Sequence, residues 1–143
     1  MAVYPHPRQS PLAAHKTLNY LYYYLAGKWA QDNGADESLV LNPDGSVSET
    51  NTANILIIKD KRVVKPLSPA VLPGIMEKQV VDCLVQWGYG LETRKIMPDE
   101  LFEADAVIMT NSLIGAVPVL NLDGRPVPYD MNLSKRVCAA VLK

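Results

Sequence analysis

Side chains that bind metals or form disulfides are scarce in this sequence of 143 residues, and the shortage excludes several kinds of function. There are two histidines, His6 and His15, and two cysteines, Cys83 and Cys138. The histidines are not spaced with either cysteine as metal ligands and no H-E-x-x-H pair occurs, so no metal site is predicted. The cysteines lie far apart without a C-x-x-C pair, which favours buried thiols in a reducing compartment over a disulfide.

Long apolar runs and an excess of one charge are also missing. Apolar runs such as 55–58 are far too short to cross a bilayer, and no secretory signal opens the chain. The formal net charge is −1, from 14 basic and 15 acidic side chains. That balance gives no reason to expect nucleic acid or an anionic membrane as a partner. We therefore expect a cytoplasmic protein with no membrane or nucleic-acid partner.

The composition is that of one soluble domain, with 48% hydrophobic and 20% charged residues. Three prolines, Pro5, Pro7 and Pro11, indicate an extended N-terminal segment over 1–15. Apolar spacing and turn residues predict the following elements. They are helices over 17–32, 74–87 and 133–141, a helical turn at 98–101, and strands at 38–41, 47–49, 53–58, 63–64, 91–96, 106–110 and 117–122.

This mixture of strands and helices lacks strict alternation. It favours an α/β or α+β domain built on a mixed, barrel-like sheet over a doubly wound fold. No G-x-G-x-x-G, G-x-S-x-G or Walker loop is present, so dinucleotide, α/β-hydrolase and P-loop chemistry have no support. From the residues alone, the prediction ends at a soluble α/β domain with Lys16, Glu49 and several polar loop residues as reactive candidates.

Four segments extend this interpretation. They are His15-Lys16-Thr17-Leu18-Asn19-Tyr20-Leu21, Asp44-Gly45-Ser46-Val47-Ser48-Glu49 running on to Thr52-Ala53-Asn54, Leu72-Pro73-Gly74-Ile75, and Thr110-Asn111-Ser112-Leu113 ending in Pro118-Val119. In this order and at these gaps, the set resembles the branched-chain and D-amino-acid aminotransferase-like family of fold-type IV pyridoxal-phosphate enzymes, which includes aminodeoxychorismate lyase. The resemblance implies that residues 16–143 form the family's C-terminal, cofactor-binding domain.

The resemblance assigns the covalent and electronic roles to three residues. Lys16 matches the lysine that carries pyridoxal 5'-phosphate and moves protons at the substrate carbon; the alternative is a solvated lysine. Glu49 matches the carboxylate that pairs with the pyridine nitrogen and keeps it protonated, and its alternative is a surface glutamate. Tyr20 matches a tyrosine beside the ring oxygen, although a core tyrosine is the competing interpretation because 22–24 are tyrosines too.

The phosphate of the cofactor is expected at the start of the second helix. Backbone amides at a helix N-terminus suit an anion, and the matching residues are Gly74, Ile75 and Met76. The family usually has threonine where this chain has Met76, and frequently arginine where it has Glu77, so one hydroxyl and one positive charge are lost here. Weaker cofactor binding is the expected consequence.

A second phosphate contact is expected in the last of the four segments. Ser112 matches a phosphate-binding hydroxyl, with Asn111 beside it, although Asn-Ser is also an ordinary turn. Asn54 is expected to brace the Glu49 loop. Arg8 is interpreted as structural, not as the arginine that the family's N-terminal domain supplies to the phosphate.

The choice of activity depends on the last segment, which resembles the lyase because aminotransferases usually have a glycine-threonine pair there. The resemblance implies conversion of aminodeoxychorismate to 4-aminobenzoate and pyruvate, a step of folate biosynthesis. A branched-chain or D-amino-acid aminotransferase and a non-catalytic assembly module are the alternatives. The family's smaller N-terminal domain has no counterpart here, so weak activity of this chain alone is expected, with a homodimer in the intact protein.

Overall fold

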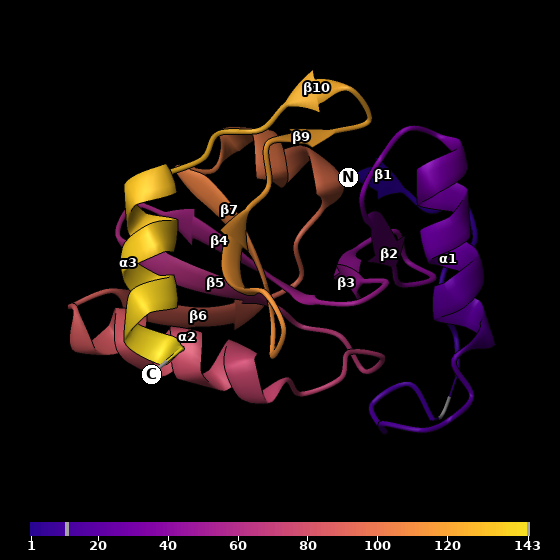
Figure 1. Cartoon of the computed structure of the whole chain (residues 1–143), viewed down its shortest axis with the longest axis horizontal. Helices are drawn as coiled ribbons and strands as arrows, with labels where there is room; N and C mark the ends of the chain where they lie inside the picture. Colours follow the sequence, from indigo (N-terminus) through magenta and orange to yellow (C-terminus); the bar gives the residue numbers. More distant parts are fainter. Residues whose placement is uncertain (11, 143) are drawn as a thin grey trace.

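The computed structural model describes residues 1–10 and 12–142, so the predictions that concern Pro11 and Lys143 lie outside the described residues. Its centre is a five-stranded sheet (Figure 1) with the strand order β6-β5-β4-β7-β8. These strands are β4 (Asn54–Lys59), β5 (Arg62–Pro66), β6 (Gly90–Arg94), β7 (Ala106–Asn111) and β8 (Gly115–Pro118). The sheet is mixed, because β5 and β6 pair in parallel while the other neighbours pair antiparallel.

Two helices cover one face of this sheet, α2 (Ile75–Gln86) and α3 (Met131–Val141). Helix α2 is also the crossover that makes the parallel pairing of β5 and β6 possible. It buries Met76, Val80 and Leu84, the helical stripe that the sequence predicts, against the β4 side chains Leu56 and Ile58. Because side chains alternate along a strand, the neighbours of Leu56 and Ile58 in β4 point to the opposite face of the sheet.

A second layer of sheet covers that opposite face. It has the order β1-β2-β3, from β1 (Ala2–Val3), β2 (Ser38–Leu41) and β3 (Val47–Thr50). Its core joins Leu39 and Val47 to Ile55 and Ile57 of β4 and to Leu101 of the 3-10 helix η1 (Pro98–Glu103). The molecule is therefore layered as helices, sheet and sheet, and among the described residues the sheets do not close into a barrel.

The extended N-terminal segment is packed against the domain. Strand β1 pairs in parallel with β2, and Met1, Ala2 and Tyr4 are buried. Further along, the Arg8 amide donates to the Leu41 carbonyl at 2.9 Å. Its first part, β1, forms the outer edge of the smaller sheet, whereas residues 12–15 form a turn.

Helix α1 (Leu21–Asp32) lies outside this smaller sheet. The prediction that it begins at residue 17 is wrong, because 17–20 form a loop in which the Leu18 side chain is fully exposed. Its buried residues are Ala26 and Ala30, whereas the apolar spacing predicts a face formed by Leu18, Leu21, Tyr22, Leu25 and Trp29. The helix therefore contacts β2 through small side chains, which the apolar spacing does not reveal.

The single strand predicted over 117–122 is divided in two. β8 ends at Pro118, and β9 (Asn121–Leu122) pairs only with β10 (Arg125–Pro126) in a separate hairpin. The Val119 amide still donates to the Val107 carbonyl of β7 at 2.9 Å, beyond the end of β8, and Asp123 and Gly124 both have positive φ, as a tight hairpin turn requires. Neither a membrane-spanning helix nor a group of three metal-ligating side chains occurs within residues 1–10 and 12–142.

Candidate active site

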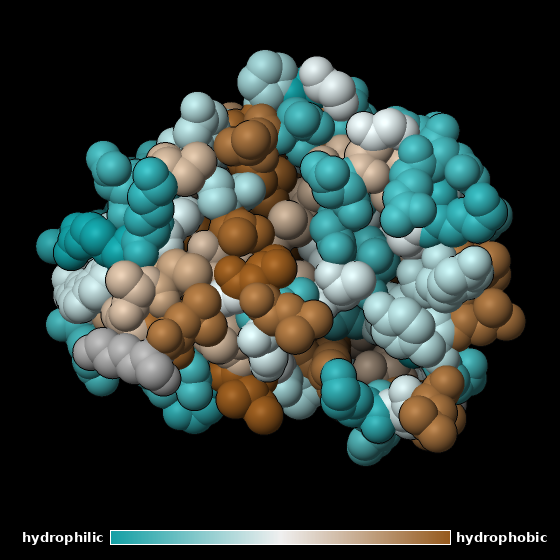
Figure 2. Space-filling model, viewed as in Figure 1, coloured by the Kyte–Doolittle hydropathy of each residue, from teal (hydrophilic) through white to brown (hydrophobic). Residues whose placement is uncertain are grey.

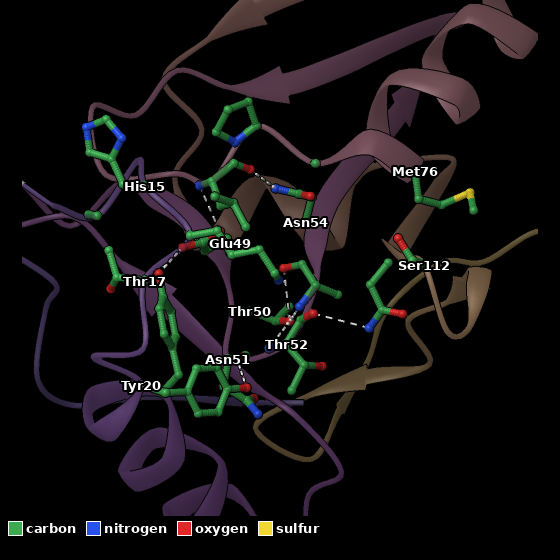
Figure 3. Close-up of a pocket in the computed structure, with 18 of the residues that line it drawn as sticks. His15, Thr17, Tyr20, Glu49, Thr50, Asn51, Thr52, Asn54, Met76 and Ser112 are labelled. Carbon is green, nitrogen blue, oxygen red and sulfur yellow. Dashed lines mark hydrogen bonds between the residues drawn. The ribbon is translucent and has the colours of Figure 1, made fainter.

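One cavity of about 700 Å³ lies where α1, the smaller sheet and the start of α2 meet. All the site residues that the sequence predicts line it. They are Lys16, Tyr20, Glu49, Gly74, Ile75, Met76, Asn111 and Ser112. Figure 3 shows His15, Thr17 and Tyr20 on one side of the cavity and Met76 and Ser112 on the other. Segments separated by almost one hundred residues thus meet at a single hollow.

Lys16 and Glu49 both line this cavity, but one is exposed and the other is buried. Lys16 is exposed on the loop before α1, whereas the Glu49 side chain is only 5% exposed, in strand β3. The Glu49 carboxylate accepts a hydrogen bond from the Tyr23 hydroxyl and another from the Leu72 amide at 3.2 Å. Burial raises the pKa of Glu49 to about 7, because these donors only partly replace the water that the charged form has lost.

Helix α2 begins at the floor of the cavity. The first amides of the helix lack intrahelical acceptors. Gly74 is the N-cap residue and has no side chain that could accept a hydrogen bond from them. A Cβ on Gly74 would lie 2.0 Å from the Asn54 Oδ1, so a side chain has no room there. The Met76 side chain is buried in the core on α2, which leaves its backbone, not its thioether, as the anion-binding group.

The negative charge of Glu77, which stands where the family frequently has arginine, is paired with a nearby lysine. Glu77 is 5% exposed, and its carboxylate lies 3.1 Å from the Lys65 Nζ of strand β5. Burial raises the pKa of Glu77, and the ion pair with Lys65 opposes that rise. The pair therefore offsets much of the repulsion that a lone carboxylate would exert on an anion at the start of α2.

Two asparagines hold the loops around the cavity. The Asn54 Nδ2 donates to the Leu72 carbonyl at 2.7 Å, so it positions the same residue whose amide binds Glu49, as the predicted bracing role requires. The Asn111 Nδ2 donates to the Thr52 carbonyl at 3.1 Å, and its Oδ1 accepts from the amide of Leu113 at 2.8 Å. Asn111 thus shapes the turn that presents the exposed Ser112.

Two residues of this site were missed as functional candidates from sequence. Tyr23 donates to Glu49, and Arg8 lines the cavity with a side chain only 8% exposed. Tyr23 lies one helical turn after Tyr20, and that i, i+3 spacing is the signal that could have selected it from the tyrosine run. Tyr20 itself is 49% exposed and donates to the Asn51 carbonyl at 3.2 Å. No local pattern in the sequence points from Arg8 to the cavity.

Three apolar side chains that line the cavity are strongly exposed to solvent. Leu18, Ile75 and Leu113 are 103%, 75% and 92% exposed, and all three line it. On the view of Figure 2, apolar side chains also gather across the middle of the molecule, between α3 and α1.

A family model described as amino-transferase class IV matches residues 2–122, most of the chain. The chain belongs to the class IV aminotransferase family. The matched range includes the N-terminal strand, the Lys16 loop, Glu49, the start of α2 and the Ser112 turn. The prediction of the family from the four segments is therefore confirmed.

Curated relatives within the class IV family include both kinds of enzyme that the sequence suggests. The chain is 36% identical over 109 residues to the branched-chain-amino-acid aminotransferase-like protein 2 of Arabidopsis thaliana, covering 76% of this chain and 20% of that protein. It is 30% identical over 128 residues to the aminodeoxychorismate lyase of Vibrio harveyi, covering 89% and 47%. The chain thus spans less than half the length of these two relatives.

Solved structures of the class IV family share the fold. The branched-chain amino acid aminotransferase from Escherichia coli superposes with a TM-score of 0.87 at 26% identity. The superposition covers 95% of this chain and 48% of that one. The predicted mixed α/β fold of a fold-type IV enzyme is confirmed. Another solved branched-chain amino acid aminotransferase, complexed with N-(5'-phosphopyridoxyl)-L-glutamate, carries a derivative of pyridoxal phosphate, the cofactor of this family.

Proposed function

We propose that this chain is the cofactor-binding half of a pyridoxal-phosphate enzyme that acts on a small molecule bearing an amino group. The observation that carries the proposal is that Lys16 and Glu49 line one cavity together with the start of α2. A cavity of about 700 Å³ falls within the usual range for small-molecule and cofactor sites. The proposal comes from the family and from this juxtaposition together.

The residues present fit pyridoxal 5'-phosphate at both of its ends. Among the described residues the hydrogen-bond donors to the buried Glu49 carboxylate, Tyr23 and Leu72, are neutral, so a protonated ring nitrogen would add a cationic donor. Ile75 and Met76 offer backbone amides at the helix N-terminus that begins after Gly74, and Ser112 offers a hydroxyl from the facing turn. When bound, pyridoxal phosphate supplies an electron sink for the bonds of the substrate amino group.

The chain's own side chains would perform the remaining chemistry. The Lys16 amine would hold the cofactor and, once released by the incoming substrate amine, would move a proton at the reacting substrate carbon. The Glu49 carboxylate would hold the proton on the pyridine nitrogen, and Tyr20 would orient the ring through its hydroxyl. These roles serve a lyase and an aminotransferase equally.

Among these activities we favour the aminodeoxychorismate lyase, which releases pyruvate and 4-aminobenzoate. The Ser112 turn resembles lyases in sequence, and the Vibrio harveyi lyase matches 89% of the chain. The higher identity to the Arabidopsis thaliana aminotransferase-like protein favours an aminotransferase as the second candidate. A homodimer and a cytoplasmic location belong to the same proposal.

Reductive labelling tests the cofactor site. The purified protein would be mixed with pyridoxal phosphate, reduced with borohydride and digested, and the modified lysine identified by mass spectrometry. We expect the label on Lys16 alone, its loss in Lys16→Arg, and its retention in the matched variant Lys28→Arg, since Lys28 is an exposed lysine paired with Asp32. Label spread over surface lysines, or unchanged in Lys16→Arg, would support a non-catalytic module instead.

The two activities are separated by their products. We expect pyruvate release from aminodeoxychorismate without any amino acceptor, because the lyase needs no second substrate. An aminotransferase would instead form glutamate from 2-oxoglutarate in proportion to the amino donor consumed. Glutamate formation without pyruvate release would replace the lyase assignment by the second candidate.

A further inference from the structure

Arg8 occupies a place that a purely structural arginine would seldom take. Its side chain is only 8% exposed, it lines the candidate active site, and its Nε has no hydrogen-bond partner within the part of the chain that the structure describes. Buried polar atoms in proteins are nearly always paired, so an unpaired guanidinium nitrogen calls for an explanation.

The explanation lies in the rings that surround the guanidinium. Its central carbon is 4.4 Å from the ring centroid of Tyr23 and 4.9 Å from that of Tyr22. The two rings meet edge to face, with centroids 5.5 Å apart. Arginine thus binds these faces by cation–π contact, which requires no hydrogen bond from Nε.

Arg8 is linked in two ways to Glu49 of the candidate active site. The Arg8 amide donates to the Leu41 carbonyl of β2, and Val40 of the same strand is paired with Glu49 of β3. From the other direction, the hydroxyl of Tyr23, on which Arg8 is stacked, donates to the Glu49 carboxylate. Arg8 and Glu49 are therefore linked both through the sheet and through one tyrosine.

We propose that Arg8 is a positioning residue for Glu49: stacked on Tyr23, it holds the phenol in the orientation in which it donates to the Glu49 carboxylate. The inference rests on the proposed function in one respect, that Glu49 faces the ring nitrogen of the cofactor. It assigns Arg8 a role other than a direct phosphate contact.

The charge state of Glu49 reports on this arrangement without any cofactor. Burial raises the pKa of Glu49, while the Tyr23 hydroxyl, the Leu72 amide and the Arg8 charge lower it. The Glu77 carboxylate from α2 raises it further, and Lys16 lines the same cavity. Losing Arg8 or the Tyr23 hydroxyl therefore favours the protonated carboxyl, in which form it cannot hold a proton on a ring nitrogen.

The test is a carboxyl ¹³C NMR titration of the cofactor-free protein, labelled at glutamate. We expect Arg8→Met and Tyr23→Phe each to raise the Glu49 pKa by about 1. Arg136→Met is the matched control, because Arg136 is also stacked on an aromatic ring, that of Trp87 at 4.6 Å, on α3 away from the cavity. In the control the Glu49 titration stays unchanged.

The double variant distinguishes positioning from simple charge. If Arg8 acts through Tyr23, the effect of Arg8→Met falls to less than half in the Tyr23→Phe background. An undiminished effect in that background, or no effect of Arg8→Met beyond that of Arg136→Met, would overturn the proposal. If Arg8→Met does not fold, Arg8→Lys carries the same comparison, because lysine keeps the charge without the planar stacking group.

The two experiments separate failure of this inference from failure of the proposed function. Failure of Lys16 labelling together with coupled shifts at Glu49 would remove the enzyme and keep the positioning relationship. Selective labelling of Lys16 with uncoupled shifts would keep the enzyme and remove the role of Arg8.

Discussion

The buried carboxylate at the centre of the cavity makes the stability of the cofactor-free protein depend on pH. The pKa of Glu49 is about 7 in the folded state, against an ordinary value of 4.5. The folded protein therefore holds this proton more tightly than the unfolded chain does. The associated stability is fully present below pH 4.5 and is lost as the pH rises through 7.

The size of the effect follows from the difference between the two pKa values. At about 1.4 kcal/mol per pKa unit, it amounts to about 3 kcal/mol in total, and most of that falls between pH 5 and pH 8. For a chain of this length the midpoint of thermal unfolding would fall by about 5–10 °C. Domain stabilities are about 5–15 kcal/mol, so the change is large.

Glu49→Gln isolates this contribution, because glutamine has the same shape and does not titrate. Urea unfolding followed by tryptophan fluorescence at pH 5 and pH 8 gives the free energy of unfolding. We expect the free energy of unfolding of the variant to rise relative to that of the wild type by about 2–3 kcal/mol between pH 5 and pH 8. Glu103→Gln, at an exposed glutamate of η1, serves as the control and should follow the wild type. Parallel pH dependences for the wild type and Glu49→Gln would refute the reasoning.

Three further substitutions, one of them with a matched control, test separate parts of the structure. Gly74→Ala would drive a methyl group into the Asn54 side chain, and we expect a loss of about 1–3 kcal/mol of stability together with weaker binding of pyridoxal phosphate. Gly90→Ala, with its nearest atom on a flexible arginine, should be much milder in the same denaturation assay. Ser112→Ala should weaken pyridoxal phosphate binding by about 5- to 10-fold, measured by absorbance titration, without changing the melting temperature. Asp130→Ala removes the N-cap of α3 and should cost about 1 kcal/mol in urea unfolding.

Much of the fold could be predicted because its signals are local. Helix α2 is bounded by Gly74 and carries its apolar stripe at helical spacing, so its limits and buried face were predicted within a residue or two. The start of α1 was not predictable in the same way. Leu18 continues the helical spacing, yet residues 17–20 leave the helix and form the loop that lines the cavity.

The gathering of the site residues was inferred from family resemblance, and the interactions among them could not be. The Tyr23–Glu49 hydrogen bond and the stacking of Arg8 depend on how α1 and the N-terminal segment fold back over β3. No short-range pattern in the sequence encodes how these segments pack over β3. The same limit applied after Pro118, where the apolar run continues although strand β8 ends and a separate hairpin begins.

The pairing of the chain's first residues with its later part has a consequence for the order of folding. The Val3 amide donates to the Asp123 Oδ1 at 2.9 Å, and the Asp123 amide donates to the Met1 carbonyl at 3.0 Å. During synthesis at about 5–20 residues per second, the first strand must wait about 6–24 s for this partner. Contacts so distant in sequence also close slowly. Strand β1 can pair with β2 much earlier, so we expect the contacts of Met1 and Val3 with Asp123 to form last, after the five-stranded sheet.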